Sequence, residues 1–354
     1  MKRIFKSFLA AISFMGLAGC LAGGLAGCSE TIEQPAEEVV EYQQVRFAVG
    51  VANTEMTKGI SGSEAAANGA TGGASGATGA TGESAQRELS DGSLAVNLDF
   101  AVYHNGEWIE SVAPAVGDTP AKNAVVTGGN GNWVVTLTLA KNVEYDIVFW
   151  AHANDAPYSF NKAEHQIVVD YSGAANDEKR DAFYACCEGY TVTDSAIDVD
   201  LTRPFAQINI GARDYDPYIT DFGFAMTSSI KCKAPSVLDV LDGSVSNEVD
   251  VEFDLESIPY EMGYEVLTET GGVTYHWMSM NYILAAKSND NLYGDFIATF
   301  NYNNLDLPVK ITSVPYRRNF KTNILGTIFT GPATFNVVVV PGYAGSDIEH
   351  PAGI

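Results

Sequence analysis

Short segments in which apolar and polar residues alternate, each ended by a turn signal, constrain the fold of this chain most. Residues 133–139 place Trp133, Val135 and Leu137 on one face, which is the period of a strand with one buried face. Asn105-Gly106 stands between two such segments and predicts a tight hairpin. No long amphipathic helix pattern occurs. The sequence therefore predicts an all-β chain of short strands.

Strands at this spacing are typical of β-sandwiches. We expect two tandem β-sandwich domains of transthyretin-like or Greek-key type, at residues 89–206 and 207–354. One short helix is predicted over Asn176–Cys187. The expected strands cover residues 45–51, 96–102, 108–110, 133–139, 145–149, 163–171, 197–211, 219–227, 246–254, 275–286, 292–302, 307–312 and 335–340.

The first residues are typical of a bacterial lipoprotein signal peptide, which we place at residues 1–27. A basic start precedes an apolar stretch, Phe8–Leu17, that is too short to span a bilayer. Leu-Ala-Gly-Cys then occurs twice, ending at Cys20 and Cys28. An acidic, polar run follows Cys28, so we expect Cys28 to be lipidated (palmitate and related acyl chains), with Cys20 as the alternative. A secreted protein cut nearby without lipid is the other interpretation.

Residues 28–58 are predicted to hold a tether and the first strand. Val45, Phe47, Val49 and Val51 alternate with small or polar residues. Residues 59–88 are rich in Gly, Ala, Ser and Thr and predict a flexible linker. The first strand must therefore pair with a sheet formed by later segments.

The formal net charge of −24 argues against nucleic acid as a partner, because phosphate binding needs clustered Lys and Arg. It also argues against docking on anionic lipid, so membrane attachment must come from acyl chains. No catalytic, cofactor or metal motif stands out, and we expect no enzyme activity and no cofactor. The weakest candidates are a Ca²⁺ loop at Asp214–Asp221 and sugar-stacking tryptophans; a solvated loop and core packing are the alternatives.

Three cysteines follow the signal region. Cys186 and Cys187 would point to opposite faces of a strand, and one of them could pair with Cys232. Small buried apolar side chains are the alternative interpretation.

Four runs carry a family resemblance: Arg180–Tyr184 (RDAFY), Leu201–Ile210 (LTRPFAQINI), Tyr282–Ala285 (YILA) and Pro315–Thr330 (PYRRNFKTNILGTIFT). In this order, behind a lipoprotein signal, they resemble the fimbrillin-like lipoproteins of Bacteroidales, the FimA-type major and minor fimbrial subunits. The resemblance covers about residues 40–345. It implies a lipid-anchored protein of the cell outer membrane that serves as a structural or adhesive subunit of a fimbrium.

The resemblance also implies an assembly route with other fimbrial subunits or further copies of this chain. A trypsin-like maturation protease cuts after an Arg behind the first strand, and a strand from another subunit fills the groove that is left. Arg87 is the expected cut site, with Arg46 and Lys58 as alternatives. Val45, Phe47, Val49 and Val51 would be the exchangeable strand.

Two features depart from the family pattern. The linker is long, and the tail after Val340 is short and holds two Pro, so it makes a poor donor strand. The donor could be Phe335–Val340, or the protein could be a terminal member that keeps its first strand. A non-polymerising surface lipoprotein that binds a glycan or a host or cell-wall ligand is the second functional hypothesis, and an anchored hydrolase is the third.

Overall fold

A computed structural model of the chain describes residues 40–51, 91–110, 124–193, 196–216, 226–264, 266–269 and 272–341. All of them belong to one compact unit, Val40–Ile354. Strands dominate this part of the chain, and the helical element that lies wholly within it is a short 3-10 turn, η3 (Glu178–Arg180). The predicted all-β class is confirmed. The described residues include no helix of the length and apolarity needed to span a membrane.

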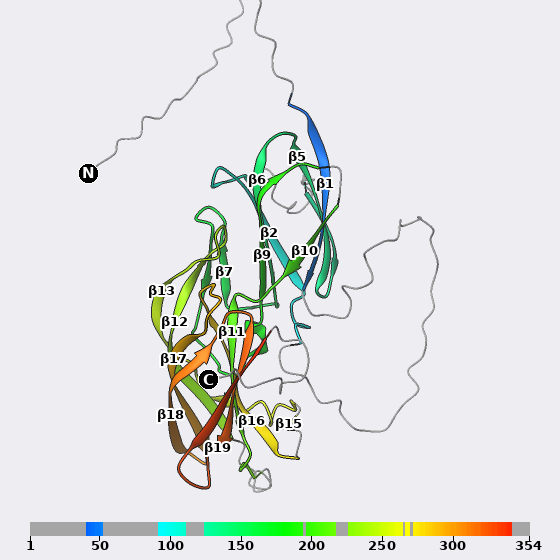
Figure 1. Cartoon of the computed structure of the whole chain (residues 1–354). Coiled ribbons are helices and arrows are strands. Elements are labelled where there is room, and N and C mark those ends of the chain that lie inside the picture. Colours follow the sequence, from blue (N-terminus) through cyan, green and yellow to red (C-terminus); the bar gives the residue numbers. More distant parts are fainter. Residues whose placement is uncertain are drawn as a thin grey trace, which may run out of the picture. The chain divides into compact units, whose positions relative to one another are not determined.

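Two four-stranded sheets enclose a smaller core (Figure 1). The first sheet has the order β10-β1-β5-β4, with bounds β10 (Ile197–Leu201), β1 (Tyr42–Val51), β5 (Asn132–Ala140) and β4 (Ala124–Gly129). The second has the order β3-β2-β6-β9, with bounds β3 (Glu107–Trp108), β2 (Asn97–His104), β6 (Glu144–His152) and β9 (Phe183–Thr191).

Two further sheets form a larger core. One has the order β15-β16-β11-β19-β20, with bounds β15 (Leu267–Thr268), β16 (Thr274–Leu284), β11 (Phe205–Ala212), β19 (Phe320–Thr327) and β20 (Thr334–Pro341). The other has the order β18-β17-β12-β8-β7, with β13 and β14 also paired to β12; its bounds are β18 (Leu305–Tyr316), β17 (Leu292–Tyr302), β12 (Thr227–Asp239), β8 (Gln166–Val169), β7 (Tyr158–Asn161), β13 (Val245–Glu252) and β14 (Glu256–Ser257).

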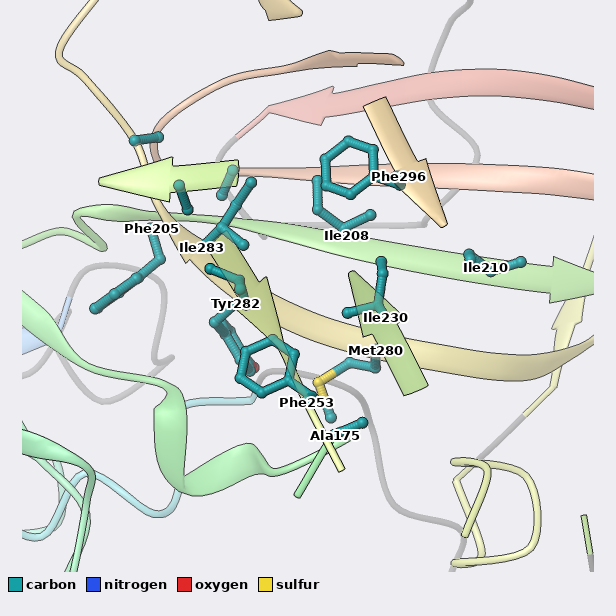
Figure 2. Close-up of a cluster of buried hydrophobic side chains, with 14 of the residues drawn as sticks. Ala175, Phe205, Ile208, Ile210, Ile230, Phe253, Met280, Tyr282, Ile283 and Phe296 are labelled. Atoms are coloured by element: carbon teal, nitrogen blue, oxygen red, sulfur yellow. The ribbon is translucent and has the colours of Figure 1, made fainter. Parts of the chain in front are cut away.

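The larger core packs side chains from both of these sheets against each other. Figure 2 shows Met280 of β16 and Ile230 of β12 near Phe253, and Ile208 of β11 beside Phe296 of β17. β11 lies in the middle of its sheet, antiparallel to β16 and parallel to β19, and all eight of its residues are buried. A strand buried on both faces explains why Phe205–Ile210 reads as nearly continuous apolar and amide residues.

The β3-β2-β6-β9 sheet contributes to both cores. Along β6, Ile147 and Phe149 lie in the smaller core, whereas Val148 and Trp150 between them lie in the larger core. Cys186 and Cys187 of β9 divide in the same way, so the prediction that they face opposite sides is confirmed. The cysteines in the described part of the chain, Cys186, Cys187 and Cys232, are free thiols, so neither of the first two forms a disulfide with Cys232. Burial raises the pKa of Cys186 and of Cys232 to about 12, which keeps both thiols protonated and unreactive at neutral pH.

Turn chemistry sets the hairpins as the sequence predicts. Asn105 and Gly106 both have positive φ, 52° and 77°, as the two-residue turn between β2 and β3 requires. Asn130 and Gly131, with φ of 50° and 81°, turn β4 into β5 in the same way.

The helix predicted over Asn176–Cys187 is wrong. Only Glu178–Arg180 forms a 3-10 turn, and the chain then enters β9, which pairs with β6. The extended strand is favoured over a helix because it places side chains against both cores, one on each face.

The longest strand, β12, is not among the predicted strands, and it contains Pro235, a residue type that disfavours a central strand. Within residues 231–236, β13 is the ladder partner of β12 in the described part of the chain, since β17 pairs with Thr227–Ile230 and β8 with Val237–Asp239. Pro235 is tolerated because this stretch of β12 has a described ladder partner on one side only. Most of the strand predicted over residues 219–227 lies outside the described residues.

The predicted division at residues 206/207 stays a prediction. β11 runs across it, and the β7–β8 hairpin, which comes before it in sequence, pairs with β12, which comes after it.

Candidate functional site

The first strand of the chain occupies the middle of a sheet formed by much later segments. β1 pairs antiparallel with β5 from Tyr42 to Gly50 and parallel with β10 from Phe47 to Val51. Figure 1 shows β1, in blue, alongside both partners. A central strand uses backbone N–H and C=O groups on both of its sides, so its loss would leave β5 and β10 with open edges.

The predicted alternation along this strand is present in the structure. The side chains of Val45, Phe47, Val49 and Val51 are between 0 and 2% exposed and lie in the smaller core. Burying an apolar side chain of this size contributes about 1.5–3 kcal/mol. The opposite face carries exposed polar side chains at Gln44 and Arg46. β1 therefore holds its place with one apolar face and two backbone ladders.

Phe47 is the central anchor of this face. It is fully buried, and its ring packs against Phe149 of β6 at 5.5 Å and edge-on against Tyr190 of β9 at 5.3 Å between centroids. Aromatic pairs in this distance range add about 0.5–1.5 kcal/mol each beyond area burial. A strand that replaced β1 would need a large apolar side chain at this register.

The two ends of β1 are fixed by backbone hydrogen bonds. The Lys141 N–H donates to the Glu41 carbonyl at 2.8 Å, and the Val51 N–H donates to the Gly131 carbonyl at 2.9 Å. The side chains of Lys141 and Glu41 also form an ion pair at 3.1 Å, but both are exposed, so this pair adds little. Apolar packing and backbone hydrogen bonds therefore hold the strand, rather than charge.

Several predicted site residues lie outside the described residues: Cys20, Cys28, Lys58 and Arg87. Their roles stay predictions. Arg46 lies within β1, where its backbone pairs with Thr136 of β5. A protease binds an extended, unpaired backbone, so this position disfavours Arg46 as a cut site.

The weaker candidates fall into structural roles. Asp214 accepts hydrogen bonds from the backbone N–H groups of Ile328, Phe329 and Thr330, at 2.8–2.9 Å. Burial opposes ionisation there, but these bonds outweigh it and lower the pKa of Asp214. The rest of the proposed Ca²⁺ loop, residues 217–221, lies outside the described part, which holds no cluster of three metal-ligating side chains. Trp133, Trp150 and Trp277 are core residues, and Trp108 is half-buried.

The four runs that carry the family resemblance contribute to a buried polar network that the sequence did not predict. Arg203 forms a two-pronged ion pair with Asp181, at 2.6 and 2.8 Å, and both side chains are nearly inaccessible. Its guanidinium also lies over the Phe183 ring, at 4.3 Å. The pair ties the segment entering β9 to the segment entering β11. The one sign of this network in the sequence was that charged residues stand next to apolar ones in these runs.

Two other groups extend the network. Arg180 donates to the carbonyls of Asp170 and Ser172 at 2.7 and 2.6 Å. On β11, Asn209 donates to Asn323 of β19 at 2.9 Å. Buried polar groups that are paired in this way fix one arrangement of the strands. These polar contacts therefore serve as scaffold in this chain.

The sequence matches one protein family, described as "Family of unknown function (DUF6562)", over residues 48–352. No curated protein matches the chain. Among solved structures, the tip fimbrial protein Mfa3 from Porphyromonas gingivalis is 11% identical, with 84% of this chain and 100% of that chain covered and a TM-score of 0.39. A fimbrial assembly protein from Parabacteroides distasonis is 10% identical, with 85% and 99% covered and a TM-score of 0.36.

Both structures come from the class of protein that the sequence resembles. TM-scores this low transfer neither structural detail nor function. The family match is of a different kind, since it spans most of the described residues from within β1 to the end of β20. The chain belongs to the DUF6562 family, a family of unknown function.

Proposed function

We propose that this protein is a cell-surface structural or adhesive subunit whose first strand can be exchanged for a strand of another subunit. The observation that carries the proposal is the placement of β1. It is remote in sequence from its partners, central in its sheet, and buries apolar side chains on one face. Strand addition between subunits uses these properties, because ladders give affinity and alternate side chains give register.

Connectivity makes this strand separable from the body. β1 ends at Val51 and β2 begins at Asn97, so a single cut between them would leave β1 held by non-covalent contacts alone. The predicted cut site, Arg87, lies in this interval. In the proposed scheme the protein is exported, lipidated at Cys28 and attached to the outer membrane, and a trypsin-like protease then frees the body from its anchor.

The register defines what an incoming strand must supply. Val45 faces Leu137 and Phe47 faces Val135 across the β1–β5 ladder. The donor therefore needs four apolar side chains at alternate positions, the second of them large. Phe335–Val340 of another copy supplies an aromatic residue, Asn336 and then four valines, so its large side chain comes first rather than second. This segment also pairs with β19 in this chain. Its use as a donor would require that pairing to open.

The test is limited digestion of the protein purified from membranes in detergent. We expect a trypsin-like protease to cut after Arg87 and to produce oligomers that resist SDS. The Arg87→Gln variant is the matched control and should stay uncut at this site and monomeric. The mass of the released N-terminal fragment reports whether Cys28 or Cys20 carries the acyl chains.

Cleavage after Arg87 with no oligomers, and with β1 still bound, would contradict strand exchange. It would favour the second hypothesis, a non-polymerising surface lipoprotein that binds a ligand.

A further inference from the structure

An open pocket of about 360 Å³ lies where the smaller core meets the turns of the larger one. Its lining comes from β9, β10, the β12–β13 turn, the β16–β17 loop and the β18–β19 turn. This volume is at the small end of the range for small-molecule sites, about 300–1,000 Å³. Tyr184, Thr202 and the pair Arg317-Arg318 bring three of the resemblance runs together here.

Three cations line this pocket: Lys287, Arg317 and Arg318. Within the described part of the chain, none of them has a carboxylate within 4.0 Å. The chain has 44 Asp and Glu but only 20 Lys and Arg, so three Lys and Arg side chains in the lining of one cavity form a local cluster of basic residues. Their charge is available for an anionic ligand.

Both guanidinium groups are held in place. Arg318 donates through Nη1 to the Gly243 carbonyl at 2.8 Å and lies over the Tyr184 ring at 5.4 Å. Arg317 donates through Nε to the Ser288 carbonyl at 3.2 Å and lies over the Phe320 ring at 4.6 Å. Burial lowers the pKa of Arg318, because the charged guanidinium has lost contact with water. A bound anion would compensate for this loss. A fixed guanidinium matches a carboxylate as a two-pronged partner.

Acidic side chains also line the pocket, at Glu188, Asp200 and Asp242. Glu188 and Asp200 are exposed and can accept hydrogen bonds from hydroxyl groups. The same carboxylates would repel a polyanion such as a phosphate polymer. The lining therefore fits a ligand with one carboxylate and several hydroxyl groups.

We propose that this pocket binds an acidic sugar residue, a uronic or sialic acid within a glycan, with its carboxylate on Arg317 and Arg318. Lys287 adds positive charge at the entrance. This site does not depend on strand exchange and would serve a subunit that polymerises as well as one that does not. The proposal rests on the proposed function in one respect: the protein must lie at the cell surface to reach cell-surface or host glycans.

The test measures binding of galacturonate oligosaccharides and sialyllactose to the purified protein by calorimetry, with galactose oligosaccharides and lactose as the neutral counterparts. We expect at least tenfold tighter binding of the acidic sugars, and weaker binding as NaCl is raised. The Lys287→Gln/Arg317→Gln double variant should lose at least tenfold in affinity. Lys310→Gln, an exposed cation on β18 outside the pocket lining, should bind like the wild type.

Equal affinity for acidic and neutral sugars, or no binding of either, would overturn the proposal. So would unchanged binding by the double variant, or binding of peptides with a free C-terminal carboxylate in place of sugars. The acidic-to-neutral ratio is measured on the unaltered protein, so it decides the question even where the double variant fails to fold. Because no protease is used, the outcome is independent of the strand-exchange test.

Discussion

The smaller and the larger core are closed in different ways. The smaller core depends on β1, and the next strand along the described chain, β2, belongs to a different sheet. The larger core is built from hairpins such as β17–β18, joined by a two-residue turn, and is tied by buried polar pairs such as Asn209–Asn323. One cut can therefore release a central strand from the smaller core, whereas no equally simple change opens the larger one.

A variant that lacks residues 1–51 should separate the two cores most strongly. Four buried side chains at about 1.5–3 kcal/mol each amount to roughly 6–12 kcal/mol, which is comparable to the whole stability of a domain. We expect fast amide hydrogen exchange in β5 and β10, with protection retained in β12 and β17. A synthetic peptide of residues 40–51 should restore protection in β5.

The matched control is the same peptide with Phe47→Asp, which should not restore protection, because it places a charge in a fully buried site. If β12 and β17 lose protection together with β5, the two cores form one cooperative unit and the comparison fails.

A second pair of variants applies the same perturbation to each core. Phe47 and Phe296 are both about fully buried, Phe47 in the smaller core and Phe296 in the larger one. Truncation of either to Ala should cost about 3–5 kcal/mol. Phe47→Ala should accelerate hydrogen exchange in β1 and β5, and Phe296→Ala should do so in β12 and β17. Identical exchange maps for the two variants would show that the cores do not unfold separately.

Local patterns explain what could be predicted from the sequence. The buried face of β1 and the Asn105-Gly106 turn are each specified by residues a few positions apart. β9 could not be predicted, because Phe183–Cys187 packs against a core on each face and so shows no alternation. The acidic-sugar pocket could not be predicted either, since it joins Tyr184, Gly243 and Arg318, which only tertiary structure brings together.

The smallest predicted effect concerns the sheet shared by the two cores. His152 Nε2 of β6 lies 3.3 Å from Asp99 Oδ2 of β2. Burial disfavours the charged imidazole, but the hydrogen bonds to Asp99 and to the Ala153 carbonyl outweigh it and raise the pKa of His152. The hydrogen bond from His152 lowers the pKa of Asp99.

These shifts fix the pH window of the pair. The contribution of His152 is fully present below its unfolded pKa of about 6.5 and is lost as pH rises through the raised folded value. The contribution of Asp99 is present above its unfolded pKa of about 3.9 and is lost as pH falls through the lowered folded value. The pair therefore stabilises the shared sheet most between about pH 4 and 6.5.

We expect Asp99→Asn to lower the free energy of unfolding by less than about 1 kcal/mol, because the Asp99 side chain is 44% exposed. The loss should be larger at pH 5 than at pH 8 in urea melts. Glu107→Gln, an exposed acid on β3 of the same sheet, is the control and should show no such difference. A loss that is equal at both pH values would mean that the pair carries no charge-dependent coupling. In that case, the two side chains would stabilise the shared sheet through packing alone.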